Sequence, residues 1–313
     1  MHVPSLLSVQ ELREIHAMAE LRFPGVLAAV TTPFGADGSV DRERYAAHCA
    51  WLVSEGVRGV IPNGSLGEYE ALSDAERASV VEIAIEAVGA SGSVVPGVSG
   101  KSAAEAVRWT EHARDAGATA VMCLPPTSHA PTDDEVVAHF GAVAEVGLPV
   151  IAYNNPFSTR VDLTPPLLER LAQIDGIAAV KEFSQDVRRV AQIRELAPSL
   201  EVLVGCDDLV AEGVLMGATG WIAGFVNAFP EPCVRLFDLC TRHAWDEALP
   251  LYRGMLPALR WDADPTFVQA IKLGQDEAGR YGGPVRLPRL PLDAQTEATV
   301  RKAVAEALEA ARR

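Results

Sequence analysis

Short apolar runs alternate with longer helical patterns along most of the chain. Each run is almost continuously apolar, which is typical of parallel strands that are buried on both faces. Eight runs fit this description: Val26–Thr31, Val57–Ile61, Val94–Val98, Ala120–Leu124, Pro149–Tyr153, Ala178–Val180, Val202–Val204 and Trp221–Ala223. The pattern therefore predicts an α/β protein built on a parallel sheet.

The segments between these runs carry helix signals. Ser73, Ser102 and Thr132 each precede a helical pattern and are followed three residues later by a glutamate, as in a capping box. Asp41 precedes a further helical pattern, and Thr164 precedes two prolines, which are favoured in a first helical turn. Glycines suited to left-handed C-caps follow several patterns, at Gly56, Gly117 and Gly147.

Eight strand-then-helix units predict a (β/α)8 TIM barrel over residues 25–244, a length close to that of other such barrels. Residues 1–24 are expected to form a short N-terminal helical extension. Residues 245–313 are expected to form a C-terminal helical extension packed on the barrel. Its predicted helices are Ala244–Arg260, Pro265–Glu277 and Thr296–Arg312.

The charge balance narrows the classes of partner. The chain has 42 acidic and 27 basic residues and a net charge of -15, which disfavours nucleic acids and anionic membranes. It contains no run of about 18 apolar residues and no basic, then apolar, secretory start. The odd cysteine count without a CxxC motif predicts reduced core thiols, and the histidines predict no metal site. A cytoplasmic protein is expected.

Lys181 is the sharpest candidate for chemistry. It follows the run Ala178–Val180 and so lies at the end of a strand where barrel enzymes place their active sites. Partial desolvation lowers the pKa of such a lysine and frees its amine to attack carbonyl carbons. The alternative is a structural lysine paired with Glu182, Asp207 or Asp208.

Two further candidates lie at neighbouring strand ends. Tyr153 ends the fifth run and is placed to relay protons beside Lys181, although it is equally compatible with a core tyrosine whose hydroxyl reaches the rim. In the turn Gly64–Glu68, backbone N–H groups and the Ser65 hydroxyl suit a carboxylate; the alternative is an ordinary turn.

Lysine is rare in this chain, because arginine supplies nearly all of the positive charge. The four lysines are Lys101, Lys181, Lys272 and Lys302. Gly97–Ser102 has part of a phosphate-loop pattern but lacks its first glycine, so Lys101 is predicted to be a solvated loop lysine. Only Lys181 ends a buried strand beside a tyrosine; the other three are interpreted as compositional.

Several motifs together resemble the dihydrodipicolinate synthase / N-acetylneuraminate lyase family of class I aldolases. They are Thr31–Phe34 (TTPF), Gly64–Glu68 (GSLGE), Tyr153–Pro156 (YNNP), the VKE around Lys181 and Gly205–Asp208 (GCDD). The resemblance covers the chain after about residue 23. It implies a barrel, a Schiff base with a 2-oxo acid and a homotetramer built as a dimer of dimers.

The resemblance also implies roles for individual residues. Lys181 is implied to be the Schiff-base lysine and Tyr153 the proton relay, with Ser65 acting beside them. The Leu66 amide is implied to hold the substrate carboxylate, and Gly64, Ile222 and Gly224 to surround the substrate. The imine acts as the electron sink, so no metal or organic cofactor is needed.

Departures from the family's synthases shape the expected reaction. Ser158 stands where synthases carry an arginine for a substrate carboxylate, and Arg160 comes two residues late. No tyrosine follows the fourth strand, where the segment reads Pro125–His129, and Leu66 replaces a threonine of the proton relay. These departures disfavour lysine biosynthesis.

Other motifs resemble 1-pyrroline-4-hydroxy-2-carboxylate deaminases and 2-keto-3-deoxy-sugar-acid dehydratases, notably Gly224–Pro230 and Phe267–Leu273. We therefore expect a lyase that deaminates or dehydrates a small 2-oxo acid or cyclic imine acid. The alternatives are a pyruvate-releasing aldolase of the same family, a 4-hydroxy-tetrahydrodipicolinate synthase, a metal-dependent aldolase and a non-catalytic 2-oxo-acid sensor.

Overall fold

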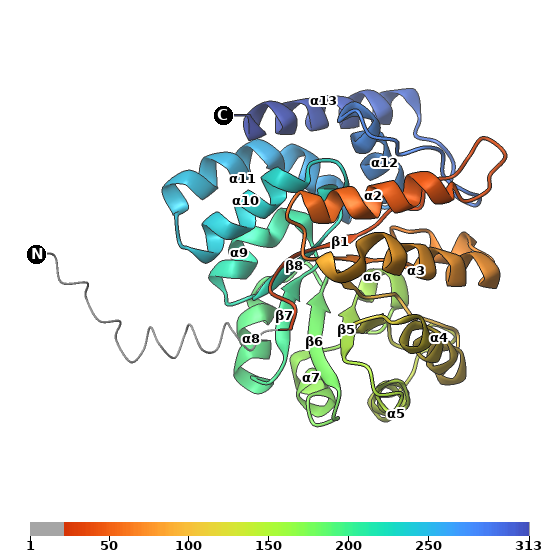
Figure 1. The fold of residues 1–313 in the computed structure, drawn as a ribbon. Coiled ribbons are helices and arrows are strands. Elements are labelled where there is room, and N and C mark those ends of the chain that lie inside the picture. Colours follow the sequence, from red (N-terminus) through yellow and green to blue (C-terminus); the bar gives the residue numbers. More distant parts are fainter. Residues whose placement is uncertain (1–21, 313) are drawn as a thin grey trace, which may run out of the picture.

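The computed structural model describes residues 22–312, in which eight parallel strands form a central barrel surrounded by helices (Figure 1). The strands are β1 Gly25–Ala29, β2 Gly59–Ile61, β3 Ser93–Val94, β4 Val121–Cys123, β5 Val150–Asn154, β6 Ile177–Glu182, β7 Glu201–Val204 and β8 Gly220–Ala223. β1 pairs with both β2 and β8, and a bridge between Gly97 and Met122 joins the β3 and β4 sides. The predicted (β/α)8 barrel is confirmed.

The helices follow the strands in alternation. Those of the barrel are α2 Arg42–Ser54, α3 Asp74–Val88, α4 Ala103–Ala116, α5 Asp133–Ala144, α6 Pro156–Thr159, α7 Pro165–Leu171, α8 Arg188–Leu196, α9 Val210–Leu215 and α10 Pro230–Thr241. Short 3-10 turns include η1 Tyr69–Ala71, η3 Asp207–Leu209, η4 Phe225–Asn227 and η5 Arg260–Ala263. The C-terminal helices are α11 Trp245–Leu259, α12 Phe267–Glu277 and α13 Ala294–Ala311, with α13 lying along α11 (Figure 1).

Two of the three predicted capping boxes form, and the third is incomplete. Ser73 and Thr132 both form complete capping boxes with the glutamates three residues later. At α4 the Ser102 hydroxyl accepts from the Glu105 N–H, but the Glu105 carboxylate accepts from the Lys101 N–H rather than from Ser102. The box is therefore incomplete, and the carboxylate instead fixes the preceding loop.

Strand lengths differ from the predicted runs for local reasons. β3 is only two residues long, because Pro62 after β2 has no N–H to return a bond, although the Val95 and Gly97 N–H groups still donate to Val60 O and Pro62 O. β6 runs further than predicted and includes Lys181 and Glu182, which pair with β7. The helix predicted within residues 1–24 lies almost entirely outside the described residues. No described helix is long and apolar enough to cross a bilayer.

A buried hydrogen-bond network joins the first helix of the barrel to its last turn. The Asn227 side-chain amide in η4 donates to Ala29 O and Gly224 O, each at 2.7 Å. Its oxygen lies 2.8 Å from Nε2 of His48 on α2. Because both amide protons are committed, the oxygen must accept, and Nε2 of His48 carries the proton. The network fixes β1 against the turn after β8.

Acidification should weaken the fold through His48. Burial lowers the pKa of His48 to about 4 from 6.5, so the folded protein binds fewer protons than the unfolded chain between these values. The contribution of neutral His48 to the free energy of unfolding is fully present above pH 6.5. It is lost as the pH falls through 4, and the loss is on the order of 3 kcal/mol. In urea unfolding at pH 7 and pH 4, His48→Gln should lose less stability than wild type. His129→Gln, at an exposed position, should match wild type; equal losses in all three proteins would contradict the assignment.

Candidate functional site

A cavity of about 590 Å³ opens at the carboxyl ends of the strands. Six of the seven residues predicted for the site line it: Gly64, Ser65, Leu66, Tyr153, Lys181 and Gly224. The seventh, Ile222, is fully buried in β8 and does not line the cavity. The barrel thus brings together residues that lie up to 160 positions apart in the sequence, because the carboxyl ends of its parallel strands lie on one face.

Lys181 lies near the carboxyl end of β6, where only 6% of its surface is exposed. It pairs in register with Tyr153 on β5, and its Nζ lies 4.4 Å from the centroid of the Tyr153 ring. The Phe183 ring centroid is 5.7 Å from the same nitrogen. Within residues 22–312, no carboxylate approaches Nζ to ion-pair distance. The amine therefore faces the cavity among aromatic rings.

Two of the three acids proposed as ion-pair partners of Lys181, Glu182 and Asp207, are occupied elsewhere. Glu182 alternates to the opposite side of the strand, where its carboxylate accepts from Asn154 Nδ2 at 3.0 Å and from the Ser184 N–H at 2.6 Å. Burial raises the pKa of the Glu182 carboxyl. Asp207 accepts from N–H groups at the end of β8, as described below. The structural alternative for Lys181 is not supported.

Gly205 makes room for the lysine side chain. An added Cβ at Gly205 would lie 2.7 Å from Glu182 O and 3.1 Å from Cε of Lys181. Only glycine fits without displacing the end of β6, so the GCDD segment after β7 has a steric role that its acidic residues do not suggest.

The turn after β2 presents free donors to the cavity. The Gly67 N–H donates to Gly64 O and the Glu68 N–H to Ser65 O, which folds the turn tightly. Across the described part of the chain, the Ser65 and Leu66 amides and the Ser65 hydroxyl have no hydrogen-bond partner. Unpaired amides facing a cavity suit an anionic oxygen, because they need no rearrangement to bind it.

The Tyr153 hydroxyl accepts from Nδ2 of Asn155 at 3.0 Å. Only 4% of the Tyr153 surface is exposed, and the ring forms the wall of the cavity beside Lys181. The side-chain oxygen of Asn155 in turn accepts from the Ser158 N–H at 3.2 Å. The YNNP segment therefore holds its tyrosine through Asn155 and leaves the hydroxyl proton free for another acceptor.

Ser158 and Arg160, which the sequence analysis singled out, lie differently relative to the cavity. Ser158 lines the cavity, whereas Arg160 is exposed and does not. The arginine that does line it is Arg289, from the segment between α12 and α13. The sequence offered no signal for Arg289, because a loop residue more than 100 positions after Lys181 has no periodic pattern to place it.

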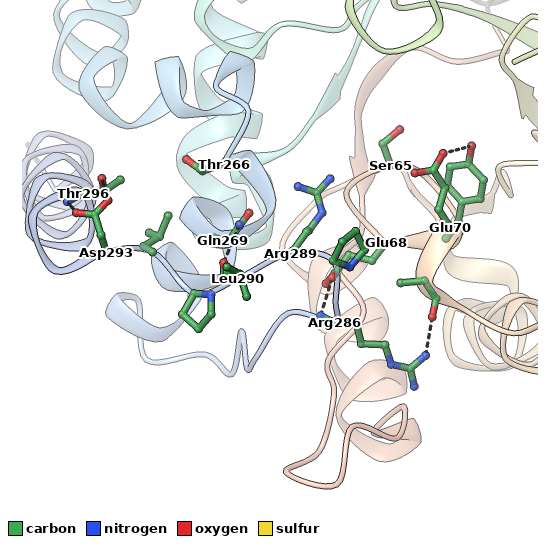
Figure 2. A pocket seen from close by; sticks show the side chains of 15 residues that line it. Ser65, Glu68, Glu70, Thr266, Gln269, Arg286, Arg289, Leu290, Asp293 and Thr296 are labelled. Carbon is green, nitrogen blue, oxygen red and sulfur yellow. Dashed lines mark hydrogen bonds between the residues drawn. The ribbon is translucent and has the colours of Figure 1, made fainter.

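A second cavity of about 560 Å³ adjoins the first and shares part of its wall: Ser65, Tyr69, Glu70 and Arg289. Figure 2 shows the side chains of Arg286 and Arg289 pointing in opposite directions from one segment. Arg286 pairs with Glu76, at 2.5 Å, and donates to Gly38 O and Ala71 O. Arg289 points between α12 and Ser65. Arg286 therefore anchors the segment that brings Arg289 to the cavity.

The interpretation of Lys272 as a compositional lysine is wrong, because this lysine forms a buried ion pair. It is 1% exposed on α12, with Nζ 2.7 Å from Oε1 of Glu68 and 2.7 Å from Pro284 O. The other Glu68 oxygen accepts from the Arg286 N–H at 3.0 Å. Burial lowers the pKa of Lys272, and Glu68 opposes that shift. This buried ion pair ties α12 and the following segment to the turn after β2. Lys101 and Lys302 are exposed, as predicted.

The cysteines lie in the core of the barrel and its helices. All five cysteines are buried and unpaired, as predicted. In the described part of the chain, no three His, Cys, Asp or Glu side chains gather as a metal ion would require.

Comparison with known proteins gives consistent relatives. The family model described as "Dihydrodipicolinate synthetase family" matches residues 22–307. A 4-hydroxy-tetrahydrodipicolinate synthase from Methanosphaerula palustris is 36% identical over 286 residues, which cover 89% of this chain and 97% of the relative.

Solved structures agree with these matches. The 4-hydroxy-tetrahydrodipicolinate synthase of Methylacidiphilum fumariolicum SolV superposes with a TM-score of 0.89 at 27% identity, covering 92% of this chain and 97% of that one. YagE, an E. coli K12 prophage protein of the dihydrodipicolinic acid synthase family solved in complex with pyruvate, gives a TM-score of 0.86 at 29% identity. That match covers 92% of this chain and 99% of YagE.

Breaking the Lys272–Glu68 pair should destabilise the protein without removing its reactive amine. Lys272→Met leaves the buried Glu68 carboxylate without its cation, so the free energy of unfolding in urea should fall by about 3–5 kcal/mol. Lys302→Met, at a position whose side chain is 78% exposed, should change it by less than about 0.5 kcal/mol. A Lys272→Met variant as stable as wild type would show that the pair does not anchor the C-terminal segment.

Proposed function

Because the chain belongs to the dihydrodipicolinate synthetase family, whose members are Schiff-base lyases, we propose that Lys181 forms a Schiff base with a small 2-oxo acid or cyclic imine acid. The single observation that carries this proposal is the buried, unpaired Lys181 amine facing a cavity beside Tyr153. The amine has no carboxylate at ion-pair distance among the described residues and lines the cavity, so it is placed to act as a nucleophile.

In this proposal the other cavity residues bind the substrate carboxylate or transfer protons. The unpaired amides of Ser65 and Leu66 hold the substrate carboxylate, which fixes carbon 2 in front of Lys181. Lys181 attacks carbon 2, and water leaves from a 2-oxo acid, or the ring amine leaves from a cyclic imine, to give the imine on Lys181. A proton then leaves carbon 3 through Tyr153, and its electron pair is delocalised onto the imine nitrogen. The covalent imine supplies the electron sink, so the proposed reaction uses no metal or organic cofactor.

The finer reaction that we propose is dehydration or deamination, as in a 1-pyrroline-4-hydroxy-2-carboxylate deaminase or a 2-keto-3-deoxy-sugar-acid dehydratase. What supports it is the cavity wall at Ser158, which offers a hydroxyl where the resemblance implies an arginine in synthases, while Arg160 is exposed outside the cavity.

A second candidate is 4-hydroxy-tetrahydrodipicolinate synthase. It is favoured by the names of the relatives, including the one that is 36% identical over nearly the full chain. Arg289 offers this candidate a cation at the cavity wall, from a different element. A retro-aldolase that releases pyruvate is a third reaction of the same intermediate.

Three assays separate these reactions. Consumption of pyruvate with aspartate semialdehyde reports the synthase, and pyruvate release in a lactate dehydrogenase assay reports the aldolase. Semialdehyde formation from 4-hydroxy-1-pyrroline-2-carboxylate or a 2-keto-3-deoxy pentonate reports deamination or dehydration. Turnover only in the first assay would replace the leading proposal by the second.

We also propose a homotetramer built as a dimer of dimers. The family is typically oligomeric, and Phe157, Leu287 and Leu290 expose 63%, 75% and 65% of their surfaces near the two cavities, which supports contact between copies. Sedimentation velocity measures the assembly directly, and a monomer at micromolar concentration would count against it.

The Schiff base itself is testable without knowing the substrate. Pyruvate with borohydride should alkylate Lys181, and mass mapping should find the adduct there and not on Lys101 or Lys272. Lys181→Ala should abolish trapping, and Tyr153→Phe should slow it by roughly 10²-fold or more, because the imine then forms without its proton relay. Lys101→Ala, at an exposed loop, is the matched control. Trapping that survives Lys181→Ala would refute the proposal.

A further inference from the structure

Asp262 is a buried acid in the wall of the Lys181 cavity, on the short turn η5 between α11 and α12. Only 8% of its surface is exposed. Its carboxyl packs directly against Gly224, where an added Cβ would lie 2.3 Å from Oδ1 of Asp262. A side chain at position 224 would displace the acid, so the glycine after β8 lets Asp262 reach the cavity.

Asp262 lies beside Asp207, whose backbone N–H donates to it, and the two acids have unequal surroundings. Asp207 accepts from Trp221 Nε1 at 3.0 Å, from the Gly224 N–H at 3.0 Å and from the Phe225 N–H at 2.7 Å. Asp262 Oδ2 accepts a single bond of 3.3 Å, from the Asp207 N–H. Among the described residues, none hydrogen-bonds to Oδ1 of Asp262.

These surroundings assign the charge to one acid and the proton to the other. Three N–H donors stabilise Asp207 as a carboxylate, whereas one long bond does little for Asp262, and two adjacent buried carboxylates cannot both ionise cheaply. Burial raises the pKa of Asp207 to about 6, and burial followed by the Asp207 charge raises the pKa of Asp262 well above its usual range. At neutral pH, Asp262 is a neutral carboxylic acid beside the cavity.

The charged groups around Asp262 come from two other elements. Asp207 and Asp208 in η3 favour its protonated form, and Lys181 on β6 opposes them. The Cys206 thiol lies before η3, and burial raises its pKa. Together these charges favour the protonated form of Asp262. A proton donor and the Lys181 amine therefore line the same cavity.

We propose that Asp262 is a catalytic acid that donates its carboxyl proton to the hydroxyl leaving carbon 4 of the substrate. This inference rests on the proposed function, and it identifies the substrate class as 2-oxo acids, or their cyclic imines, with a hydroxyl at carbon 4. A neutral acid serves this step where a carboxylate would repel the departing oxygen.

The step balances in atoms and electrons. After the carbon 3 proton has left the imine, the nitrogen lone pair re-forms the C2–N double bond and the electrons of the C2–C3 double bond form a C3–C4 double bond. The C4–O bond breaks with its electron pair going to oxygen, and the proton of Asp262 completes a water molecule. The proton taken from carbon 3 then replaces the one that Asp262 gave, so nothing is oxidised or reduced.

Asp262→Asn tests the assignment, because the amide keeps the shape and neutrality but has no acidic proton. Two probes carry the leaving hydroxyl, 4-hydroxy-1-pyrroline-2-carboxylate and a 2-keto-3-deoxy pentonate. With the probe that wild type converts, kcat should fall by roughly 10²-fold or more while KM stays within a few-fold. Asp175→Asn, the same change at an exposed residue outside the cavity, should retain wild-type kcat.

Methyl hydrogen exchange of pyruvate in D2O, followed by NMR, separates this inference from the proposed function. Exchange needs Lys181 and Tyr153 but no leaving group, so Asp262→Asn should keep it. Loss of exchange in wild type would refute the Schiff base itself. Loss only in Asp262→Asn, unchanged turnover in that variant, or wild-type exchange without turnover of either probe would each overturn the role of Asp262.

Two measurements keep the inference testable if Asp262→Asn does not fold. Asp262→Ser, checked by circular dichroism, removes the acid with a smaller side chain and should show the same split between exchange and turnover. In wild type, kcat should fall as the pH rises through the pKa of the acid, because its proton is then lost. A kcat that stays level or increases toward high pH would contradict the assignment.

Discussion

The site depends on the closure of eight strands into a barrel, and closure depends on backbones that approach too closely for side chains. An added Cβ at Gly220 would lie 2.4 Å from Phe23 O, and one at Gly59 would lie 2.4 Å from Ser93 O. These contacts lie at the seams between β8 and β1 and between β2 and β3. Once the seams close, the carboxyl ends of all strands meet, and the amine of β6 faces the turn after β2 across one cavity.

Within that cavity, partner atoms rather than burial determine what each charged group can do. Lys181 and Lys272 are both buried, but Lys272 is held by Glu68 and a carbonyl, whereas Lys181 lies beside aromatic rings with no ion-pair partner among residues 22–312. Asp207 and Asp262 differ in the same way, since one receives three N–H groups and the other one. Pairs of like residues thus acquire separate roles from their hydrogen-bond partners.

The parts of this arrangement that follow the strand pattern could be predicted from the sequence. The apolar runs located the barrel, and a run that ends in lysine beside one that ends in tyrosine located Lys181 and Tyr153. The C-terminal extension could be predicted as helices, but not as a contributor to the cavity. Asp262 and Arg289 reach the cavity through non-local packing, which has no periodic signature. Lys272 was misinterpreted for a related reason, because its partner Glu68 lies 204 residues away in the sequence.

The segment between α12 and α13 has a consequence for how such proteins diverge. It is anchored to the barrel by Arg286 and Lys272, yet the residues that it presents to the cavity, such as Arg289, take no part in closing the barrel. Substitutions there change the cavity wall without disturbing the strands or the reactive amine. A lineage can therefore acquire a new substrate by altering the tail of the chain while the inherited chemistry of the barrel stays intact.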